Sequence, residues 1–286
     1  MDAAVSTRAG GRLERRLDIE CRLLLDAIHR RFHYDFRAYA AGSMERRLRL
    51  ALERFGCAGP AQLQDRLASE PELFPALLDL LTVQVSEMFR DPLHFRALRE
   101  QVLPRLKTWP SLKIWVAGCG TGEEAYSIAI LLAEEGLLER SMLYATDINP
   151  RGLAEARAGI YPVRKLAAFT LNHRESGARG SLADHYTAAY DRALLDRRLR
   201  ERIVFCDHSL ATDHVFAEVQ LVSCRNVLIY FNRELQDRAL GLFREALCRG
   251  GFLGLGAQES LVLSAHADVF RPFVPQARLY QRRGAP

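Results

Sequence analysis

The sequence predicts an α/β domain with a mainly parallel sheet, preceded by a small all-helical domain. Before about residue 85, apolar residues recur three and four positions apart, which is typical of amphipathic helices. From Leu112 onward, short apolar stretches alternate with helical patterns, which is typical of parallel strands joined by helices. A glycine-rich turn, VAGCGTGEEAYS, lies between the first of these strands and its helix.

The composition is that of an ordinary globular protein. The chain has 286 residues, of which 49% are hydrophobic and 26% charged, with a formal net charge of +5, and the length predicts about two domains. The N-terminus is polar and contains arginine, and no apolar run approaches the ~20 residues that cross a bilayer. The six cysteines form no CxxC pair. We therefore expect a cytoplasmic protein with reduced thiols and no direct membrane insertion.

We expect the helical domain to occupy residues 1–85. Its helical stretches are LDIECRLLLDAIHRRF, MERRLRLALERF, AQLQDRLA and ELFPALLDLLTV. Residues 1–56 contain twelve arginines and no lysine against eight acidic residues, a net excess of four positive charges. A solvated helix surface is the simplest interpretation of this excess.

We expect the α/β domain to occupy residues 86–286. The candidate strands are LKIWVAG, SMLYATD, RIVFCD, VQLVSCRN and GGFLGLG. The clearest helices between them are RGLAEARAGI and RELQDRALGLFREAL. Periodicity is weak over residues 165–202, where HYTAAYD and RALLD leave open a small inserted β subdomain.

The glycine turn predicts a nucleotide-type site. Gly118, Gly120 and Gly122 alternate, and glycine allows positive φ and close approach of a ligand to the backbone. A dinucleotide site usually has GxGxxG, whereas this turn is GxGxG and is followed at once by Glu123 and Glu124. Carboxylates there would repel a pyrophosphate but would suit S-adenosylmethionine, which has a sulfonium, an α-amino group and a ribose. Alternatively, the glutamates only favour the positive end of the helix.

A further acidic residue ends the second strand. Asp147 lies twenty-five residues beyond Gly122, where a carboxylate accepts hydrogen bonds from ribose hydroxyls. Alone, it would be interpreted as a helix cap for NPRGLAEA. Together with the glycine turn, it predicts an adenosine-type crevice at the carboxyl ends of parallel strands.

The chain resembles the CheR-type chemotaxis receptor methyltransferases. The blocks that carry this resemblance are LTVQVSEMFRD, AGCGTGEEAYSIAI, YATDINPRGLAEARAGIY and CRNVLIYFNRELQ, followed by GGFLGLGAQESL. They keep their order over residues 81–261, and the helical region resembles the family's N-terminal domain. The resemblance implies a Rossmann-like S-adenosylmethionine-dependent methyltransferase domain without a metal. The implied reaction esterifies glutamates in the helical cytoplasmic region of methyl-accepting chemotaxis receptors, yields S-adenosylhomocysteine and serves sensory adaptation.

The resemblance also implies individual site residues. Arg90 and Tyr230 match the arginine and tyrosine near the reacting methyl group, and we expect them to be catalytic. The residues expected to bind the cofactor are Gln84, Ser86, Arg90, Gly118, Gly120, Glu124, Asp147, Ser209, Leu210, Cys224 and Arg225. The family often has asparagine, threonine and asparagine where this chain has Gln84, Ser86 and Ser209, so individual hydrogen bonds are expected to differ there.

Elementary chemistry gives these residues their roles. A glutamate carboxylate is already anionic at neutral pH, so its attack on a sulfonium methyl needs positioning rather than a general base. Arg90 would orient that carboxylate through a bidentate pairing, and the Tyr230 ring would stabilise the cation. Without the resemblance, a salt bridge of Arg90 to Asp91 or Glu87 and a core position for Tyr230 are the simpler interpretations.

The basic helix MERRLRLALERF is a candidate for receptor docking, because receptor methylation regions are glutamate-rich helical bundles. Arg46, Arg47 and Arg49 are expected on the side opposite Leu48 and Leu52. We expect a monomer that binds no nucleic acid.

Other functions were weighed against this one. A nucleic-acid methyltransferase would carry an NPPY-like element where this chain has SCRNVLIYF, which argues against that class. A non-catalytic adapter that binds cofactor or receptor stays open. His29 and His33 lack a third ligand, and Cys224 is expected to be a wall of the cofactor site rather than a nucleophile.

Overall fold

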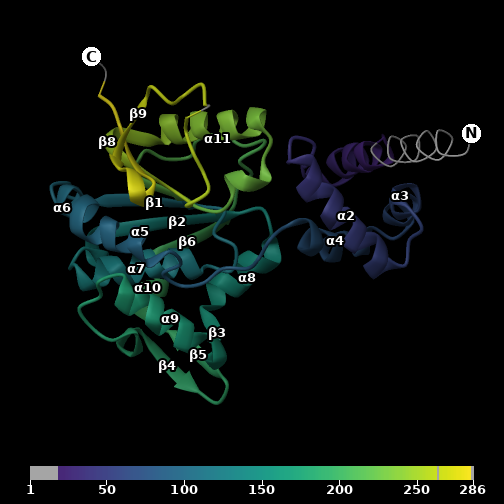
Figure 1. Ribbon diagram of the computed structural model, residues 1–286. Coiled ribbons are helices and arrows are strands. Elements are labelled where there is room, and N and C mark those ends of the chain that lie inside the picture. Colours follow the sequence, from purple (N-terminus) through teal and green to yellow (C-terminus); the bar gives the residue numbers. More distant parts are fainter. Residues whose placement is uncertain (1–18, 263, 285–286) are drawn as a thin grey trace, which may run out of the picture. The chain divides into compact units, whose positions relative to one another are not determined.

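The computed structural model describes residues 19–262 and 264–284 (Figure 1). The chain forms two compact units. The first comprises Met1–Val83 and Tyr230–Leu235, and the second comprises Gln84–Ile229 and Gln236–Pro286. Within the described ranges, no helix combines the length and the apolar character that crossing a membrane requires.

The first unit is built from short amphipathic helices. They span residues 19–32, α2 (Ala41–Phe55), α3 (Pro60–Ser69) and α4 (Phe74–Leu81). Their apolar faces meet in a core that includes Leu24, Leu48 and Leu77, each at most 1% exposed. Gly56 ends α2 with φ 64, a left-handed conformation that favours glycine.

A short segment from late in the sequence completes this unit. Residues Tyr230–Leu235 cluster with the N-terminal helices rather than with the sheet. The Ala40 N–H donates to the Tyr230 carbonyl at 2.8 Å, and the Asn232 N–H donates to the Ala38 carbonyl at 2.9 Å. Tyr230 is therefore part of the helical unit.

The second unit is built on a seven-stranded sheet of order β6-β2-β1-β7-β8-β10-β9 (Figure 1). Its strands are β1 (Leu112–Ala117), β2 (Ser141–Asp147), β6 (Ile203–Asp207), β7 (Val219–Cys224), β8 (Leu247–Leu255), β9 (Phe270–Val274) and β10 (Leu279–Arg282). The first five run parallel to one another, and β10 runs antiparallel to β8 and β9. The predicted mainly parallel α/β fold is thus confirmed.

Helices cover both faces of this sheet. They are α5 (Pro92–Ala97), α6 (Leu103–Leu106), α7 (Glu123–Glu134), α8 (Pro150–Ala158), α9 (Val163–Glu175), α10 (Arg197–Arg200) and α11 (Arg233–Ala246). Ile114 and Val116 of β1 join the core beneath α7, while Trp115 contacts Phe243 of α11, with ring centroids 5.3 Å apart. Because successive strand residues point to opposite faces, β1 is buried on both sides.

A smaller antiparallel sheet lies between α8 and β6 in the sequence. Its order is β3-β5-β4, with β3 (Ile160–Pro162), β4 (Tyr186–Ala189) and β5 (Arg192–Leu195). Its strands β4 and β5 fall within HYTAAYD and RALLD. Ala193 and Leu195 bury their side chains in the main core, so this sheet is anchored through one face.

The glycine at the end of the β1–α7 turn gives a test of this packing. Gly122 has φ +91, and a Cβ there would lie 2.8 Å from the Ala156 Cβ. Gly136 has φ +69 but open space around its Cα. We expect Gly122→Ala to lower the free energy of unfolding by about 2–5 kcal/mol through backbone strain plus overpacking, and Gly136→Ala by about 1–2 kcal/mol. Urea denaturation of both variants measures the difference, and equal losses would contradict close packing at Gly122.

Candidate active site

The turn between β1 and α7 is shaped by its glycines. Gly118, Gly120 and Gly122 all have positive φ, and a Cβ at Gly118 would lie 2.4 Å from Cγ2 of Val227. The Gly118 N–H donates to the Thr146 carbonyl of β2 at 2.7 Å. The turn is therefore held close to β2 on one side and to the loop after β7 on the other.

Asp147, the last residue of β2, bonds directly to this turn. Its carboxylate accepts the Gly120 N–H at 2.8 Å and the Asn149 N–H at 2.9 Å. Burial raises the pKa of Asp147, and hydrogen bonds from Asn149, Gly120 and the Gln84 side chain oppose that rise. The cap of α8 is the Asn149 side chain, so Asp147 does not have the capping role that its position alone would suggest.

The side chain of Gln84 lies beside Asp147 and the glycine turn. Its side chain bonds to Asp147, while its Oε1 atom is buried without a hydrogen-bond partner in the described part of the chain. That oxygen lies 3.6 Å from where a Cβ of Gly120 would be. Ser86, two residues further along, is half-buried. A ligand with hydrogen-bond donors would satisfy the Gln84 oxygen.

The two glutamates that follow the turn have different surroundings. Glu123 is fully buried, and its carboxylate pairs with Lys165 Nζ at 3.0 Å. Glu124 accepts the Ser223 hydroxyl at 2.6 Å and pairs with Arg225 Nη1 at 3.3 Å. Ser223 and Arg225 flank the end of β7, so Glu124, unlike Glu123, faces the carboxyl edge of the sheet.

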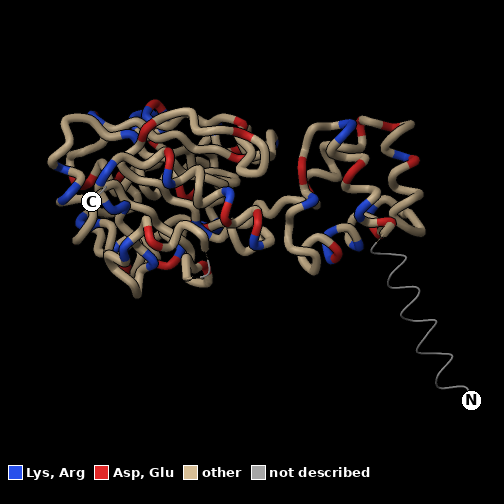
Figure 2. Tube along the Cα trace, turned by 90° about the horizontal axis from the view of Figure 1, so that it is seen from above, with Lys and Arg blue, Asp and Glu red and all other residues tan. Residues whose placement is uncertain are grey.

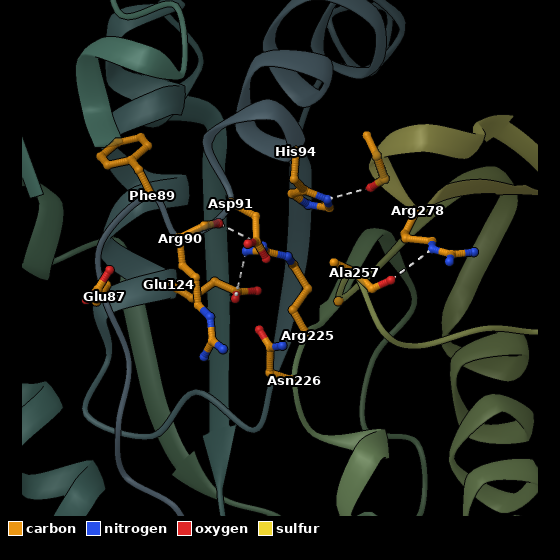
Figure 3. A network of polar contacts seen from close by, with 12 residues as sticks. Glu87, Phe89, Arg90, Asp91, His94, Glu124, Arg225, Asn226, Ala257 and Arg278 are labelled. Carbon is orange, nitrogen blue, oxygen red and sulfur yellow. Dashed lines mark hydrogen bonds and ion pairs between the residues drawn. The ribbon is translucent and has the colours of Figure 1, made fainter. Parts of the chain in front are cut away.

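Arg225 is the centre of the polar network in Figure 3. Its side chain is 1% exposed, and Nη2 donates to Asp91 Oδ2 at 2.8 Å and to the Arg90 carbonyl at 2.7 Å. The guanidinium also lies 5.3 Å from the centre of the Phe95 ring. A buried guanidinium requires such pairing. Nη1 pairs with Glu124 and Nη2 with Asp91 and the Arg90 carbonyl, so Arg225 holds these groups together, while its buried Nε has no hydrogen-bond partner among the described residues.

Arg90 is presented differently. It is exposed, and its guanidinium has no hydrogen bond or ion pair with any residue that the structure describes; Figure 3 shows it directed away from Asp91. Its neighbours Phe89 and Asp91 have φ 53 and 57, values that side-chain-bearing residues rarely adopt. Phe89 is held by full burial and by donating its N–H to Ser127 Oγ at 2.8 Å. The backbone on both sides of Arg90 is therefore held in a strained conformation, while its side chain stays exposed.

The loop after β6 approaches the same edge. The His208 N–H donates to the Asp147 carbonyl at 3.3 Å, and the Ser209 N–H donates to Asp213 Oδ2 at 2.9 Å. Leu210 is 6% exposed. The structure thus brings Ser209 and Leu210 to the end of β2, near Asp147.

Cys224 ends β7 and is fully buried. Burial raises the pKa of its thiol well above the usual value, and the nearby carboxylates of Glu259 and Glu124 raise it further. A thiol of this kind stays protonated and uncharged, so it is a poor nucleophile. This agrees with the expectation that Cys224 only lines the cofactor site.

The arginines of α2 and Tyr230 belong to the first unit. Arg46 and Arg49 are exposed, on a helix where basic and acidic positions are interspersed (Figure 2). Arg47 is only 7% exposed; it donates to the Leu81 carbonyl at 2.9 Å and lies 4.8 Å from the centre of the Tyr230 ring. The expected position of Arg47 on the open side of α2 is therefore wrong, because the buried face of α2 is wide enough to include it.

Two acidic residues beside the site were not predicted from the sequence. Asp91 is the second carboxylate partner of Arg225. The sequence feature that could have identified it is its place in the MFRD block. Glu259 is 3% exposed and accepts backbone N–H groups from the loop after β7. The sequence feature that could have identified Glu259 is the GGFLGLGAQESL block, which belongs to the resemblance but implied no role for any of its residues.

Among the described residues, no group of three or more His, Cys, Asp or Glu side chains could hold a metal ion.

These features define a class of protein. A parallel sheet with a glycine turn after β1, an acid at the end of β2 and an acid opening α7 is the architecture of S-adenosylmethionine-dependent methyltransferases, and the family model "CheR methyltransferase, SAM binding domain" matches residues 84–276. The model "CheR methyltransferase, all-alpha domain" matches residues 19–82. The chain belongs to the CheR methyltransferase family.

Relatives support the same assignment. "Putative methyltransferase Cher3" of Pseudomonas putida is 55% identical over 94% of this chain and 98% of its own length. A chemotaxis protein methyltransferase of Listeria monocytogenes is 30% identical over 80% of this chain and 85% of its own. The solved N-methyltransferase NodS of Bradyrhizobium japonicum, in complex with S-adenosylhomocysteine, covers 59% of this chain and 62% of its own at 15% identity; its TM-score of 0.34 is too low to carry an argument.

The residues at this edge fit S-adenosylmethionine. Glu124 and Asp147 are carboxylates, and Gln84 Oε1 is a buried acceptor for which the described residues offer no hydrogen-bond donor. These groups match a ligand with a positive charge, an amino group and ribose hydroxyls. The glycine turn allows close approach of that ligand to the backbone.

The different surroundings of Glu123 and Glu124 give a matched test. We expect Glu124→Gln to weaken binding of S-adenosylhomocysteine by about tenfold or more, because a carboxylate at the carboxyl edge is lost. Glu123→Gln removes an ion pair whose lysine, Lys165, is partly exposed and stays hydrated, so it should lower the free energy of unfolding by about 1–2 kcal/mol and change affinity little. Calorimetric titration and urea denaturation measure the two effects, and equal losses of affinity would refute the distinction.

The thiols give a second test. Burial raises the pKa of Cys119 and of Cys224, so very little thiolate exists at pH 8. In the native protein at pH 8 we expect iodoacetamide to modify the half-buried Cys57 and to leave these two unmodified. Mass spectrometry of the digested protein measures the labelling. Modification of Cys224 at the rate of Cys57 would show that its thiol is open and reactive.

Proposed function

We propose that this protein transfers a methyl group from S-adenosylmethionine to glutamate carboxylates of methyl-accepting chemotaxis receptors, forming glutamate methyl esters. The observation that carries the proposal is the exposed guanidinium of Arg90, which has no hydrogen bond or ion pair among the described residues and is held by a strained backbone whose carbonyl accepts from Arg225, the partner of Glu124. A free guanidinium is suited to a carboxylate acceptor, with which it forms a bidentate pairing.

The reaction needs positioning rather than proton transfer. When bound, S-adenosylmethionine supplies a methyl group on a positively charged sulfur. Glu124, Asp147 and Gln84 would hold the cofactor, and Ser209 and Leu210 would border it. Arg90 would align the acceptor carboxylate for in-line attack. Such alignment contributes on the order of 7–11 kcal/mol in well-oriented reactions, and the carboxylate is already ionised at neutral pH.

Tyr230 keeps the catalytic role that the family resemblance implies for it. Arg47 lies over its ring and is anchored to the Leu81 carbonyl, so we assign Arg47 the role of orienting Tyr230 instead of a docking role. A tyrosine ring beside the methyl-bearing cation would stabilise that cation.

Arg46 and Arg49 would meet the receptor. Both are exposed on α2, and neither side chain has an ion pair within the part of the chain that the structure describes. Leu50, 52% exposed, lies beside them and offers an apolar contact. An acidic receptor helix matches this combination of charge and apolar surface. Since the methylated part of the receptor is cytoplasmic, we place the reaction in the cytoplasm.

The proposal is tested with methyl-labelled S-adenosylmethionine and membranes that carry the host's chemoreceptors. We expect label on the receptors that mild base releases as methanol, because carboxyl methyl esters are labile to base. Label that resists base would place the methyl group on another atom and contradict the proposal. Binding of cofactor without any labelling would favour a non-catalytic adapter.

Variants of Arg90 make this assay specific. Arg90→Ala should abolish labelling, and Arg90→Lys should restore little of it, because an ammonium cannot form the bidentate pairing. Arg96→Ala is the control: Arg96 is also exposed but donates to the Glu175 carbonyl, and we expect near-normal labelling.

The docking surface gives a separate prediction. Reversing two charges with Arg46→Glu and Arg49→Glu should raise the KM for receptor by about tenfold or more while the affinity for S-adenosylhomocysteine stays unchanged. The control is the pair Arg105→Glu and Arg249→Glu, which changes the net charge equally on exposed positions of the second unit. Equal effects of both pairs on KM would show that only net charge matters.

A further inference from the structure

The block GGFLGLGAQESL contains a buried acid that the proposed reaction does not use. Glu259 follows β8 and is 3% exposed, although no cation pairs with it among the described residues. A lone buried carboxylate is costly unless hydrogen bonds replace its lost hydration. The partners of Glu259 are all backbone N–H groups.

These N–H groups converge from the loop after β7 and from the turn that holds Glu259. Glu259 Oε1 accepts the Val227 N–H at 2.8 Å and the Ile229 N–H at 3.4 Å. Oε2 accepts the Gly256 N–H at 2.6 Å and the Asn226 N–H at 3.1 Å. Both oxygens therefore act as acceptors. A donor group in the place of either oxygen would face backbone N–H groups that are themselves donors.

The loop that Glu259 holds is under strain and closely packed. Asn226 has φ 60, a left-handed value for a residue with a side chain. A Cβ at Gly256 would lie 2.8 Å from the Asn226 nitrogen and 2.8 Å from Glu259 Oε2, so glycine is needed there. On its other side, the loop presses Val227 against Gly118 of the cofactor turn.

The loop also lies between two groups of functional residues. Arg225, which pairs with Glu124 and Asp91, immediately precedes it, and Tyr230 immediately follows Ile229. Its conformation therefore sets both the packing of Val227 against Gly118 and the point where the chain enters the Tyr230 segment.

We propose that Glu259 is a positioning residue for methyl transfer: its carboxylate gathers the N–H groups of Asn226, Val227 and Ile229 and so fixes the loop that follows Arg225 against the glycine turn. It touches neither cofactor nor acceptor. The inference rests on the proposed function only for its effect on turnover, because the effect on the loop exists whatever the acceptor is.

The test compares Glu259→Gln with Glu135→Gln. Glutamine preserves the shape of Glu259 but turns one oxygen into an NH₂ group that must face backbone donors. Glu135 is the matched control, since its side chain is also buried, 4% exposed, and pairs with Arg99 and Lys107 at the far end of α7. The readouts are hydrogen–deuterium exchange, the thermal midpoint, the affinity for S-adenosylhomocysteine and turnover per cofactor-binding chain.

For Glu259→Gln we expect faster exchange confined to residues 224–230 and a loss in turnover of about tenfold or more per binding-competent chain. Glu135→Gln should lower the thermal midpoint without either effect. Normal exchange in residues 224–230 of Glu259→Gln, or exchange raised throughout the unit, would overturn the proposal. If the wild-type chain itself does not label receptors, the proposed function fails, while exchange and cofactor affinity still decide the role of Glu259.

Discussion

The burial of Arg225 is the interaction on which the site depends. A guanidinium that is 1% exposed needs anionic partners, and it finds them in Glu124 from α7 and Asp91 from the segment before α5. The loss of one partner of such a group commonly costs about 3–5 kcal/mol, because a charge is then left buried and unpaired. Arg225 therefore fixes three parts of the chain: the end of β7, the first turn of α7 and the backbone that carries Arg90.

Strain is concentrated around the same network. Six non-glycine residues of the described chain have positive φ, and three of them, Phe89, Asp91 and Asn226, adjoin Arg90 or Arg225. Each such conformation costs on the order of 1–3 kcal/mol and persists only where the surroundings enforce it. Full burial enforces it at Phe89, the Arg225 ion pair at Asp91 and the Glu259 carboxylate at Asn226. The backbone strain is therefore concentrated at the segments that hold Arg90 and Arg225 in place.

Local patterns made the sheet predictable. The apolar stretches of β1, β2, β6, β7 and β8 are bounded by polar turns, and the glycine turn with Asp147 marks the carboxyl edge. The β9–β10 hairpin was not predicted, because Pro272 and the exposed Arg271 interrupt the alternation expected of a strand. The segment Tyr230–Leu235 follows a core strand in sequence yet joins the helical unit, which no local pattern indicates.

The site was predictable in its residue types but not in its pairings. The family resemblance singled out Glu124 as a cofactor residue, but the sequence did not reveal that Lys165 pairs with Glu123 and Arg225 with Glu124. The sequence predicts Arg47 on the exposed face of α2, because charged side chains are usually exposed. In the structure Arg47 is buried, and the Tyr230 ring and the Leu81 carbonyl compensate for its lost hydration. Such partners come from distant parts of the chain, and spacing within one helix cannot reveal them.

The most direct test of the central role of Arg225 is a double-mutant cycle with Arg225→Met and Glu124→Gln, read out as the affinity for S-adenosylhomocysteine. If Arg225 acts by holding Glu124, the affinity of the double variant for S-adenosylhomocysteine should equal that of the single variant with the lower affinity. The coupling free energy is then about 1–3 kcal/mol. Additive losses, with a coupling free energy near zero, would contradict the account, because the two residues would then act independently on the cofactor.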